Sequence, residues 1–130
     1  MYMLDTNIVS ELIRNPTGLV AQRAKAAGSA ICVSVIVAAE LRYGCAKKGS
    51  PRLLRRVEEF LKEVPVLPFD VPADSAYGDI RAELEAIGRP IGSNDLLIAA
   101  HAQTLGATVV TANASEFRRI RGLNVENWLV

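Results

Sequence analysis

Cysteine is scarce in this sequence of 130 residues, and long uninterrupted apolar segments are missing. The two cysteines, Cys32 and Cys45, lack the paired spacing of a zinc site or a redox motif, so we expect reduced packing residues. No apolar run reaches the roughly 18 to 20 residues that span a bilayer. We therefore expect no membrane partner.

Net charge is also small, because 15 Lys and Arg face 14 Asp and Glu, which gives +1. This balance predicts no strong global attraction to nucleic acid, so a polyanion must be bound by local features. Apolar residues begin at Tyr2 and leave no room for a signal peptide, so a cytoplasmic location is expected. With 50% hydrophobic content and no repeat or linker, residues 1–130 are expected to form one domain.

Short apolar segments alternate with helical patterns along the chain. Strands are expected within residues 1–7, 30–35, 64–69, 108–111 and 125–129. Helices are expected at residues 6–14, 17–27, 35–46, 72–87, 96–105 and 115–120, with another beginning at Pro51. This alternation predicts an α/β fold with a parallel sheet covered on both faces. Pro65 and Pro68 favour an edge position for the third strand.

Four acidic residues follow or precede strands at positions where their side chains can meet. Asp5 follows the first strand, Glu40 lies in the helix after the second, and Glu116 opens the short helix after the fourth. In a parallel sheet these strand-to-helix turns fall at one edge. Asp95, in the first turn of the helix before the fourth strand, would reach this edge from a helix N-terminus.

Four close carboxylates repel one another at neutral pH unless a cation compensates them. Ligand sets made only of oxygen favour Mg²⁺ or Mn²⁺ over zinc. Such ions lower the pKa of bound water and hold phosphate oxygens, which suits hydrolysis of a phosphodiester.

Each acid also has a simpler interpretation. Asp5 could be only a turn or cap residue, and Asp95 only a helix cap. Glu40 could pair with a neighbouring Arg on the surface of its helix. Glu116 could be an ordinary acidic residue of a first helical turn.

Polar side chains beside these acids could orient carboxylates or water at a metal. They are Thr6, Asn7, Asn94, Thr111 and Asn113. Their alternative role is capping and turn formation, which we favour for Asn94. Thr6 is also expected to cap the helix that begins near Asn7.

His101 lies six residues beyond Asp95, about 240° round a helix, so it faces elsewhere and is expected to be a packing or surface residue. Ser10, Ser34 and the cysteines have no suitably placed histidine in the sequence, which argues against a nucleophilic triad.

Two groups of cationic residues are candidate phosphate contacts, although most charge runs are solvated faces. Near the C-terminus they are Arg118, Arg119 and Arg121, and in the middle of the chain Lys47, Lys48, Arg52, Arg55 and Arg56. Lys47, Lys48 and Gly49 are expected to form a polar break between helices.

Four segments in order resemble the motifs of a known family. They are Leu-Asp-Thr-Asn-Ile at 4–8, Ala-Glu-Leu-Arg-Tyr-Gly at 39–44, Ile-Gly-Ser-Asn-Asp-Leu-Leu-Ile-Ala-Ala at 91–100 and Thr-Ala-Asn-Ala-Ser-Glu-Phe at 111–117. The sequence resembles PIN-domain ribonucleases, most closely VapC-type toxins of bacterial type II toxin–antitoxin systems. The resemblance extends from Met1 to Trp128.

This resemblance implies a three-layer α/β/α PIN-like fold with a central sheet of four to five strands, and endoribonuclease activity that depends on Mg²⁺ or Mn²⁺. It also implies a metal site at Asp5, Glu40, Asp95 and Glu116, homodimers, and a hetero-oligomer with a small antitoxin whose tail occupies a groove beside the site. Many PIN domains carry an Asp where this chain has Asn113. The fourth ligand, Glu116 or Asn113, and the number of ions therefore stay open.

The leading hypothesis is an endoribonuclease in which Asp5, Asp95 and Glu40 hold the ion and Glu116 helps bind or activate the attacking water. An alternative is a phosphatase with Asp5 as the nucleophile, but that chemistry usually needs a second acid near Asn7 and a lysine near strand four. Another alternative is a catalytically silent module that binds RNA or protein, which the acids disfavour because carboxylates without metal repel phosphate.

Overall fold

The computed structural model describes residues 1–130 and contains one five-stranded sheet. The strands are β1 (Tyr2–Leu4), β2 (Ile31–Ser34), β3 (Val66–Leu67), β4 (Thr108–Val110) and β5 (Val125–Glu126). They lie in the order β3-β2-β1-β4-β5, and every neighbouring pair is parallel. The predicted parallel sheet is confirmed, and so is the edge position of the third strand.

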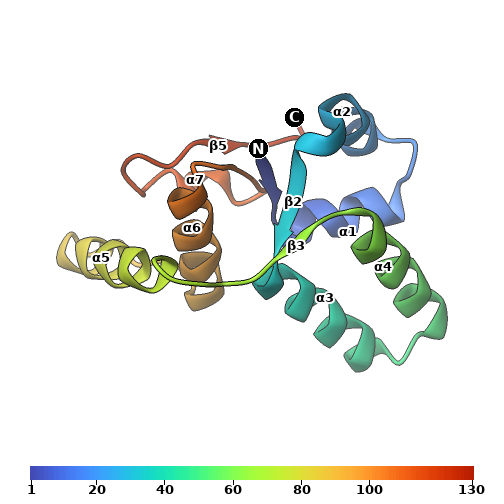
Figure 1. Cartoon of the computed structure of the whole chain (residues 1–130), viewed down its shortest axis with the longest axis horizontal. Coiled ribbons are helices and arrows are strands. Elements are labelled where there is room, and N and C mark those ends of the chain that lie inside the picture. Colours follow the sequence, from blue (N-terminus) through green and yellow to red (C-terminus); the bar gives the residue numbers. More distant parts are fainter.

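Helices cover both faces of this sheet. They are α1 (Thr6–Arg14), α2 (Leu19–Ala27), α3 (Val35–Lys48), α4 (Pro51–Glu63), α5 (Ala73–Ala86), α6 (Ser93–Leu105) and α7 (Ala114–Phe117), with a 3₁₀ turn at Gly28–Ala30. Figure 1 shows α1 to α4 on one side of the strands and α5 to α7 on the other. The expected three-layer α/β/α fold is confirmed. None of the helices has the length and apolar character that crossing a membrane requires.

Local sequence signals explain where α3 and α4 begin and end. The Ser34 hydroxyl accepts a hydrogen bond from the Ile36 N–H at 3.1 Å, and the Ser50 hydroxyl accepts one from the Leu53 N–H at 3.2 Å. Gly49 ends α3 with a φ of 63°, a left-handed conformation that favours glycine. Lys47 and Lys48 lie in the last turn of α3, so the polar break predicted there was wrong by two residues.

The C-terminal elements are shorter than predicted. Helix α7 ends at Phe117, because the N–H groups of Arg119 and Ile120 bond carbonyls only three residues back. Strand β5 ends at Glu126, whose carboxylate accepts a hydrogen bond from the Trp128 indole N–H at 3.0 Å. Local hydrogen bonds thus occur where the sequence had predicted a longer helix and a longer strand.

The core is one hydrophobic cluster of 25 buried residues drawn from both helical layers and the sheet. All four residues of β2 are buried, as expected for a strand covered on both faces. Cys32 and Cys45 are buried and free, which confirms their packing role, and burial raises the pKa of the Cys32 thiol.

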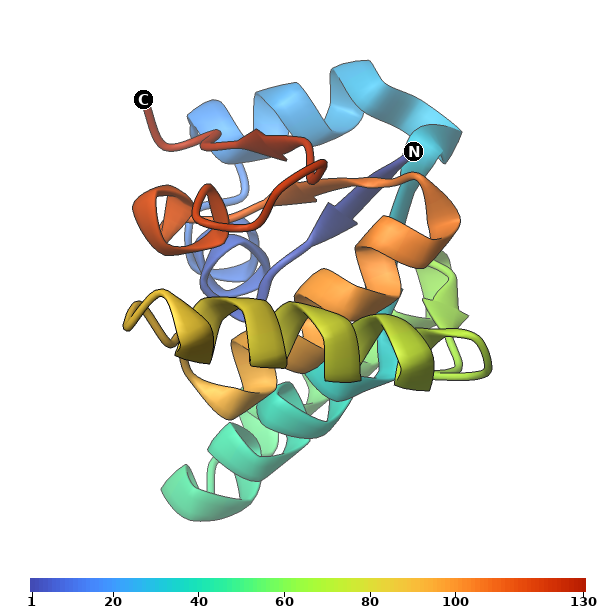
Figure 2. The same ribbon diagram turned by 90° about the vertical axis from the view of Figure 1, so that its left-hand side faces the viewer.

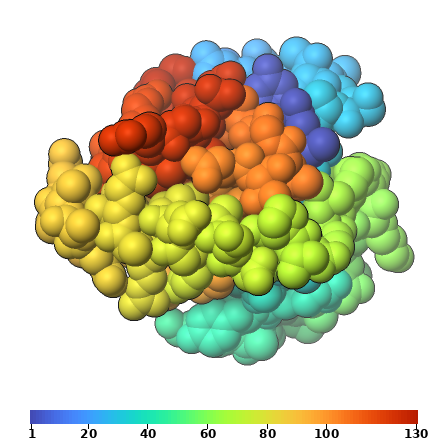
Figure 3. All heavy atoms as spheres, turned by 60° about the vertical axis from the view of Figure 1, so that its left-hand side comes forward, coloured from blue at the N-terminus to red at the C-terminus, as the bar shows by residue number.

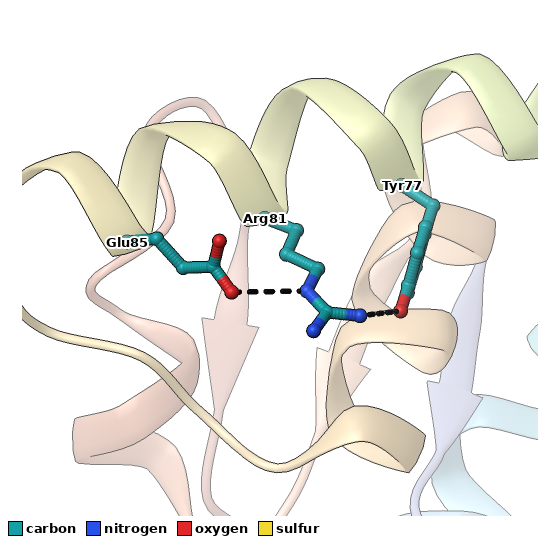
Figure 4. A network of polar contacts seen from close by, with 3 residues as sticks. All are labelled: Tyr77, Arg81 and Glu85. Carbon is teal, nitrogen blue, oxygen red and sulfur yellow. Dashed lines mark hydrogen bonds and ion pairs between the residues drawn. The ribbon is translucent and has the colours of Figure 1, made fainter.

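Helix α5 lies outside α6 and forms a ridge across this face of the molecule (Figures 2 and 3). On its surface, the Arg81 guanidinium donates to the Glu85 carboxylate at 3.1 Å and to the Tyr77 hydroxyl at 2.9 Å (Figure 4). Both charged side chains are about half exposed, so this pair adds little to stability.

Candidate active site at the carboxyl edge of the sheet

Strand β1 lies at the centre of the sheet, with β2 and β3 on one side of it and β4 and β5 on the other. Leu4 of β1 is aligned with Val110 of β4, so the residues that follow both strands emerge side by side. Open α/β sheets bind ligands at such a switch in strand order. Asp5 follows β1 and Thr111 follows β4 at this point.

Asp5 is held in a defined orientation by three donors. Its carboxylate accepts hydrogen bonds from the Thr6 N–H at 2.8 Å, the Thr111 hydroxyl at 2.7 Å and the Asn7 amide at 3.3 Å. The residue is only 3% exposed, and this burial, together with the negative charge of Glu40, raises the pKa of Asp5 although the three hydrogen bonds act to lower it. Asp5, not Thr6, is the N-cap of α1, which corrects the predicted cap.

Glu40 points from α3 to the same edge. The Thr6 hydroxyl donates to one of its carboxylate oxygens, and the Asn94 amide donates to the other at 3.3 Å. No ion pair involves Glu40, so the simpler interpretation of a surface pair with Arg is wrong. Because Asp5 caps α1, the Thr6 hydroxyl is free to donate to Glu40.

Asp95 is the third residue of α6, whose N-cap position is Gly92, and it makes no capping bond. Its pKa is raised to about 6, first by burial and then by the negative charges of Asp5, Glu116 and Glu40. Asp95 therefore lies close enough to each of the other three acids of the sequence hypothesis for their charges to repel its own. None of them pairs with Lys or Arg in any of the chain's ion pairs.

The acids do not form a closed set of ligands. No group of three or more His, Cys, Asp or Glu side chains is arranged as a finished metal site, and the oxygens of Glu40 face Thr6 and Asn94 instead. The donors are nevertheless all carboxylate oxygens without a compensating cation. This chemistry fits a hard divalent ion better than a zinc site.

The expected supporting residues connect the loops after β1 and β4. The Asn7 side chain donates to Asp5 and accepts a hydrogen bond from the Ala112 N–H at 2.9 Å. The Thr111 hydroxyl accepts one from the Asn113 N–H at 3.0 Å while it donates to Asp5.

The capping role favoured for Asn94 was wrong, because Gly92 is the N-cap of α6 and the Asn94 amide donates instead to Glu40, 54 residues away in the sequence. Its place next to Asp95 was the available signal.

His101 faces away from Asp95, as its helical spacing predicted, and its ring packs edge-on against Phe69. The absence of a histidine partner for Ser34 was a wrong prediction, because His101 Nδ1 lies 2.8 Å from the Ser34 hydroxyl. Both residues are buried, at 3% and 0% exposed, and burial lowers the pKa of His101. This pair is a buried polar contact and not an accessible nucleophile.

The C-terminal arginines have different surroundings. Arg119 donates to the Pro90 carbonyl at 3.1 Å and so ties α7 to the loop before Asp95. Arg121 is 90% exposed and lies 3.6 Å from Glu83, while Arg118 is exposed. Arg119 thus supports the loop that delivers Asp95, a role the sequence did not indicate.

Comparison with known proteins agrees with this geometry. The family model of the PIN domain matches residues 2–123. The chain is 41% identical over 128 residues to the tRNA(fMet)-specific endonuclease VapC of Shigella flexneri, which covers 98% of this chain and 97% of the relative. It is 42% identical over 130 residues to ribonuclease VapC2 of Haemophilus influenzae, with 98% of each covered.

Solved structures show the same similarity. The DNA-bound VapBC of Salmonella typhimurium matches with a TM-score of 0.91 and 41% identity over 98% of this chain and 97% of that one. VapBC2 of Rickettsia felis, bound to a promoter DNA fragment, matches with a TM-score of 0.89 and 39% identity over 98% of each chain. With its sheet, its acidic edge and these full-length relatives, the chain belongs to the PIN-domain family, among its VapC ribonucleases.

Proposed function

We propose that this chain is an endoribonuclease that depends on Mg²⁺ or Mn²⁺ and cuts RNA phosphodiester bonds at the carboxyl edge of the sheet. The observation that carries this proposal is the group of four carboxylates without a cationic partner, one of which has its pKa raised to about 6 by burial and by the other three. Such a group is costly unless a divalent cation compensates it.

Asp5, Asp95 and Glu40 would hold the ion, and Glu116 would help bind or activate the attacking water. When bound, a divalent ion would offset the charge of the phosphate and make water more acidic. Asp5 is kept in place by Thr111 and Asn7, so this ligand is oriented before any ion arrives. The half-buried Glu116 and the exposed Asn113 remain the two candidates for a fourth ligand.

The two alternatives gain no support from specific contacts. A phosphatase would need Asp5 as an accessible nucleophile, but this carboxylate is buried and accepts three hydrogen bonds. A silent binding module would have no use for acids that repel phosphate.

A small antitoxin is the proposed partner of this nuclease. The VapBC structures similar to this chain contain relatives in complex, and one related protein of 28% identity is named as a member of a toxin–antitoxin family. We propose a homodimer that binds such an antitoxin in a hetero-oligomer, and that release from it leads to RNA cleavage and growth arrest. Arg118, Arg119 and Arg121 would contact the RNA backbone, although Arg119 already donates to the Pro90 carbonyl.

The first substrate to test is initiator tRNA, because a relative with 41% identity is named a tRNA(fMet)-specific endonuclease. Purified protein is incubated with total RNA and with this tRNA, in Mg²⁺ and in EDTA, and new ends are mapped. We expect cleavage that EDTA stops and that Asp5→Asn lowers by more than about 100-fold, because a direct ligand matters more than its supporting residues. Unchanged cleavage by Asp5→Asn in saturating Mg²⁺ contradicts the assignment.

A further inference from the structure

A buried pair of polar side chains links two helices that each carry an acid of the candidate site. Ser34 is the N-cap of α3, the helix that carries Glu40. His101 belongs to α6, which has Asp95 in its first turn. His101 Nδ1 lies 2.8 Å from the Ser34 hydroxyl, and the two helices pack against each other. The pair therefore lies in the contact that determines where the two acids stand relative to each other.

A second contact joins the same helices at the edge of the sheet. There the Asn94 amide donates to the Glu40 carboxylate at 3.3 Å. Along α3 the chain runs from Ser34 to Glu40, whereas along α6 it runs from Asn94 to His101, so the two helices have opposite directions at this contact. The two contacts are about two helical turns, or roughly 9 Å, apart. Both the start of α3 and its acidic residue are thus bonded to α6.

The His101 ring has little freedom to leave Ser34. Both residues are buried, and the ring meets Phe69 edge-on, with ring centroids 5.6 Å apart and an angle of 76° between the planes. The Ser34 hydroxyl also accepts from the Ile36 N–H, and one proton and two lone pairs allow a hydroxyl to make both bonds. Separating the pair would leave polar atoms unpaired inside the protein, which is costly.

Apolar packing alone gives α6 weak control over its position. The buried residues next to His101 in this helix are Ala99, Ala100 and Ala102. Side chains of this size interlock little with a neighbouring helix, so sliding or rotation costs less than it would for larger ones. A directed hydrogen bond fixes one register, as buried polar residues do in some coiled coils. Registry matters here, because a metal site needs its ligands within about 0.5 Å of the productive geometry.

We propose that His101 is a positioning residue of the nuclease site, whose bond to Ser34 fixes α3 against α6 and so places Glu40 opposite Asp95 for a divalent ion. This inference rests on the proposed metal-dependent function. His101 itself would touch neither the ion nor RNA, because it is buried about two helical turns from Asp95. It acts through the helices that carry the ligands.

Two substitutions of His101 separate its hydrogen bond from its packing. His101→Asn keeps a polar atom near the position of Nδ1, since both are attached to Cγ, but it leaves part of the space empty. His101→Leu has a similar volume but cannot bond Ser34. Ile80→Val, which trims a buried side chain of α5, is the control for a general loss of stability. Each purified chain is titrated with Mn²⁺ in a calorimeter, and its Tm is measured in EDTA.

We expect His101→Leu to weaken Mn²⁺ binding about tenfold, the lower end of the usual effect of losing a residue that orients a ligand. His101→Asn should bind Mn²⁺ nearly as the native chain does, even where its Tm is lower. Ile80→Val should lower the Tm and leave Mn²⁺ binding unchanged. If His101→Leu binds Mn²⁺ as tightly as His101→Asn or more tightly, His101 only fills space and the proposal is overturned.

The other member of the pair gives an independent measurement. Ser34→Ala removes the bond to His101 together with the cap of α3, so it should weaken Mn²⁺ binding at least as much as His101→Leu does. The double variant should bind Mn²⁺ no more weakly than Ser34→Ala alone, because the two substitutions remove one shared bond. Additive losses in the double variant would contradict the proposed role of that bond.

Failure of this inference can be told apart from failure of the proposed function. If the native chain binds no Mn²⁺, the metal-dependent function fails, and hydrogen exchange in EDTA decides the inference. The backbone N–H groups of Glu40 and Leu41 should then exchange faster in His101→Leu than in His101→Asn, because only the former frees the start of α3. Equal exchange in the two variants would overturn the positioning role.

Discussion

At the scale of single residues, the site depends on how one buried carboxylate is held. Asp5 has almost no access to solvent, and the Thr111 hydroxyl donates the shortest of its three hydrogen bonds, at 2.7 Å. The same hydroxyl accepts from the Asn113 N–H, so it couples the carboxylate to the loop after β4. A substitution of Thr111 should therefore disturb the orientation of the Asp5 carboxylate more than the stability of the fold.

Thr111→Val keeps the shape of the side chain but removes the donor to Asp5. We expect RNA cleavage to fall by about 10 to 100-fold, the usual effect of losing a residue that orients a metal ligand. The measurement is the initial rate as a function of Mg²⁺ concentration, which should shift to higher Mg²⁺. Thr108→Val at the other end of β4 is the control, and an equal loss there would contradict the role of Thr111.

Asp95 should make the stability of the metal-free protein depend on pH. Its pKa is raised from 3.8 to about 6 in the folded chain, so the folded state binds the proton more tightly than the unfolded state. The stabilisation by that proton is complete below about pH 4 and is lost as pH rises through 6. In EDTA, Asp95→Asn should have a higher Tm than the native chain at pH 8, and the same Tm at pH 4.

Thermal unfolding between pH 4 and pH 8 checks this expectation, with Asp79→Asn on the exposed surface of α5 as the control. Mg²⁺ should raise the Tm of the native chain more at pH 8 than at pH 5, because protons compete with the ion for carboxylates. A difference in Tm between Asp95→Asn and the native chain that does not vary with pH would contradict the shifted titration.

At the scale of elements, the helices end where local backbone conformation requires it. Gly106 follows α6 with a φ of 66°, and its N–H bonds carbonyls of the last turn. Gly78 lies inside α5, is exposed, and has open space around the position of a Cβ. Replacing these two glycines of one helical layer by alanine should therefore change the free energy of unfolding in opposite directions.

Gly106→Ala should destabilise the protein by about 1 to 2 kcal/mol, because a Cβ is disfavoured in the left-handed conformation. Gly78→Ala should stabilise it by about 0.5 to 1 kcal/mol, because alanine restricts the unfolded chain and suits a helix interior. Chemical denaturation followed by circular dichroism measures both. The same sign of change for the two variants would contradict this description.

At the scale of the whole molecule, both helical layers share a single hydrophobic cluster with the sheet. Helices α3 and α5 lie on opposite sides of the sheet in Figure 1, and Leu41 of α3 and Leu84 of α5 both belong to this cluster. A continuous core of this kind predicts that the layers unfold together. The acidic edge is supported by elements of both layers and should be lost in the same transition.

Leu41→Ala and Leu84→Ala should each lower the free energy of unfolding by about 2 to 5 kcal/mol, through lost burial and a new cavity. Urea denaturation should show one transition for each variant, followed equally by circular dichroism and by the fluorescence of the buried Trp128. Two separate transitions in either variant would indicate layers that unfold independently.

Local patterns in the sequence determined the elements, since apolar periodicity and capping residues act within a few positions. The end of α1 at Arg14 was predicted correctly although its cap was not, and β3 was correctly placed at the sheet edge. The choice of the four acids also came from the sequence, because each stands at a strand end or a helix start. The short α7 was less predictable, because hydrogen bonds three residues apart ended it early.

Only the tertiary structure decided which side chains meet. The bonds between Thr111 and Asp5, between Asn94 and Glu40, and between His101 and Ser34 join residues 54 to 106 positions apart. Such contacts depend on strand order and on the angle at which each helix packs, which periodicity does not encode. For the same reason, the sequence by itself predicted an acidic cluster, whereas the raised pKa of Asp95 required the folded chain.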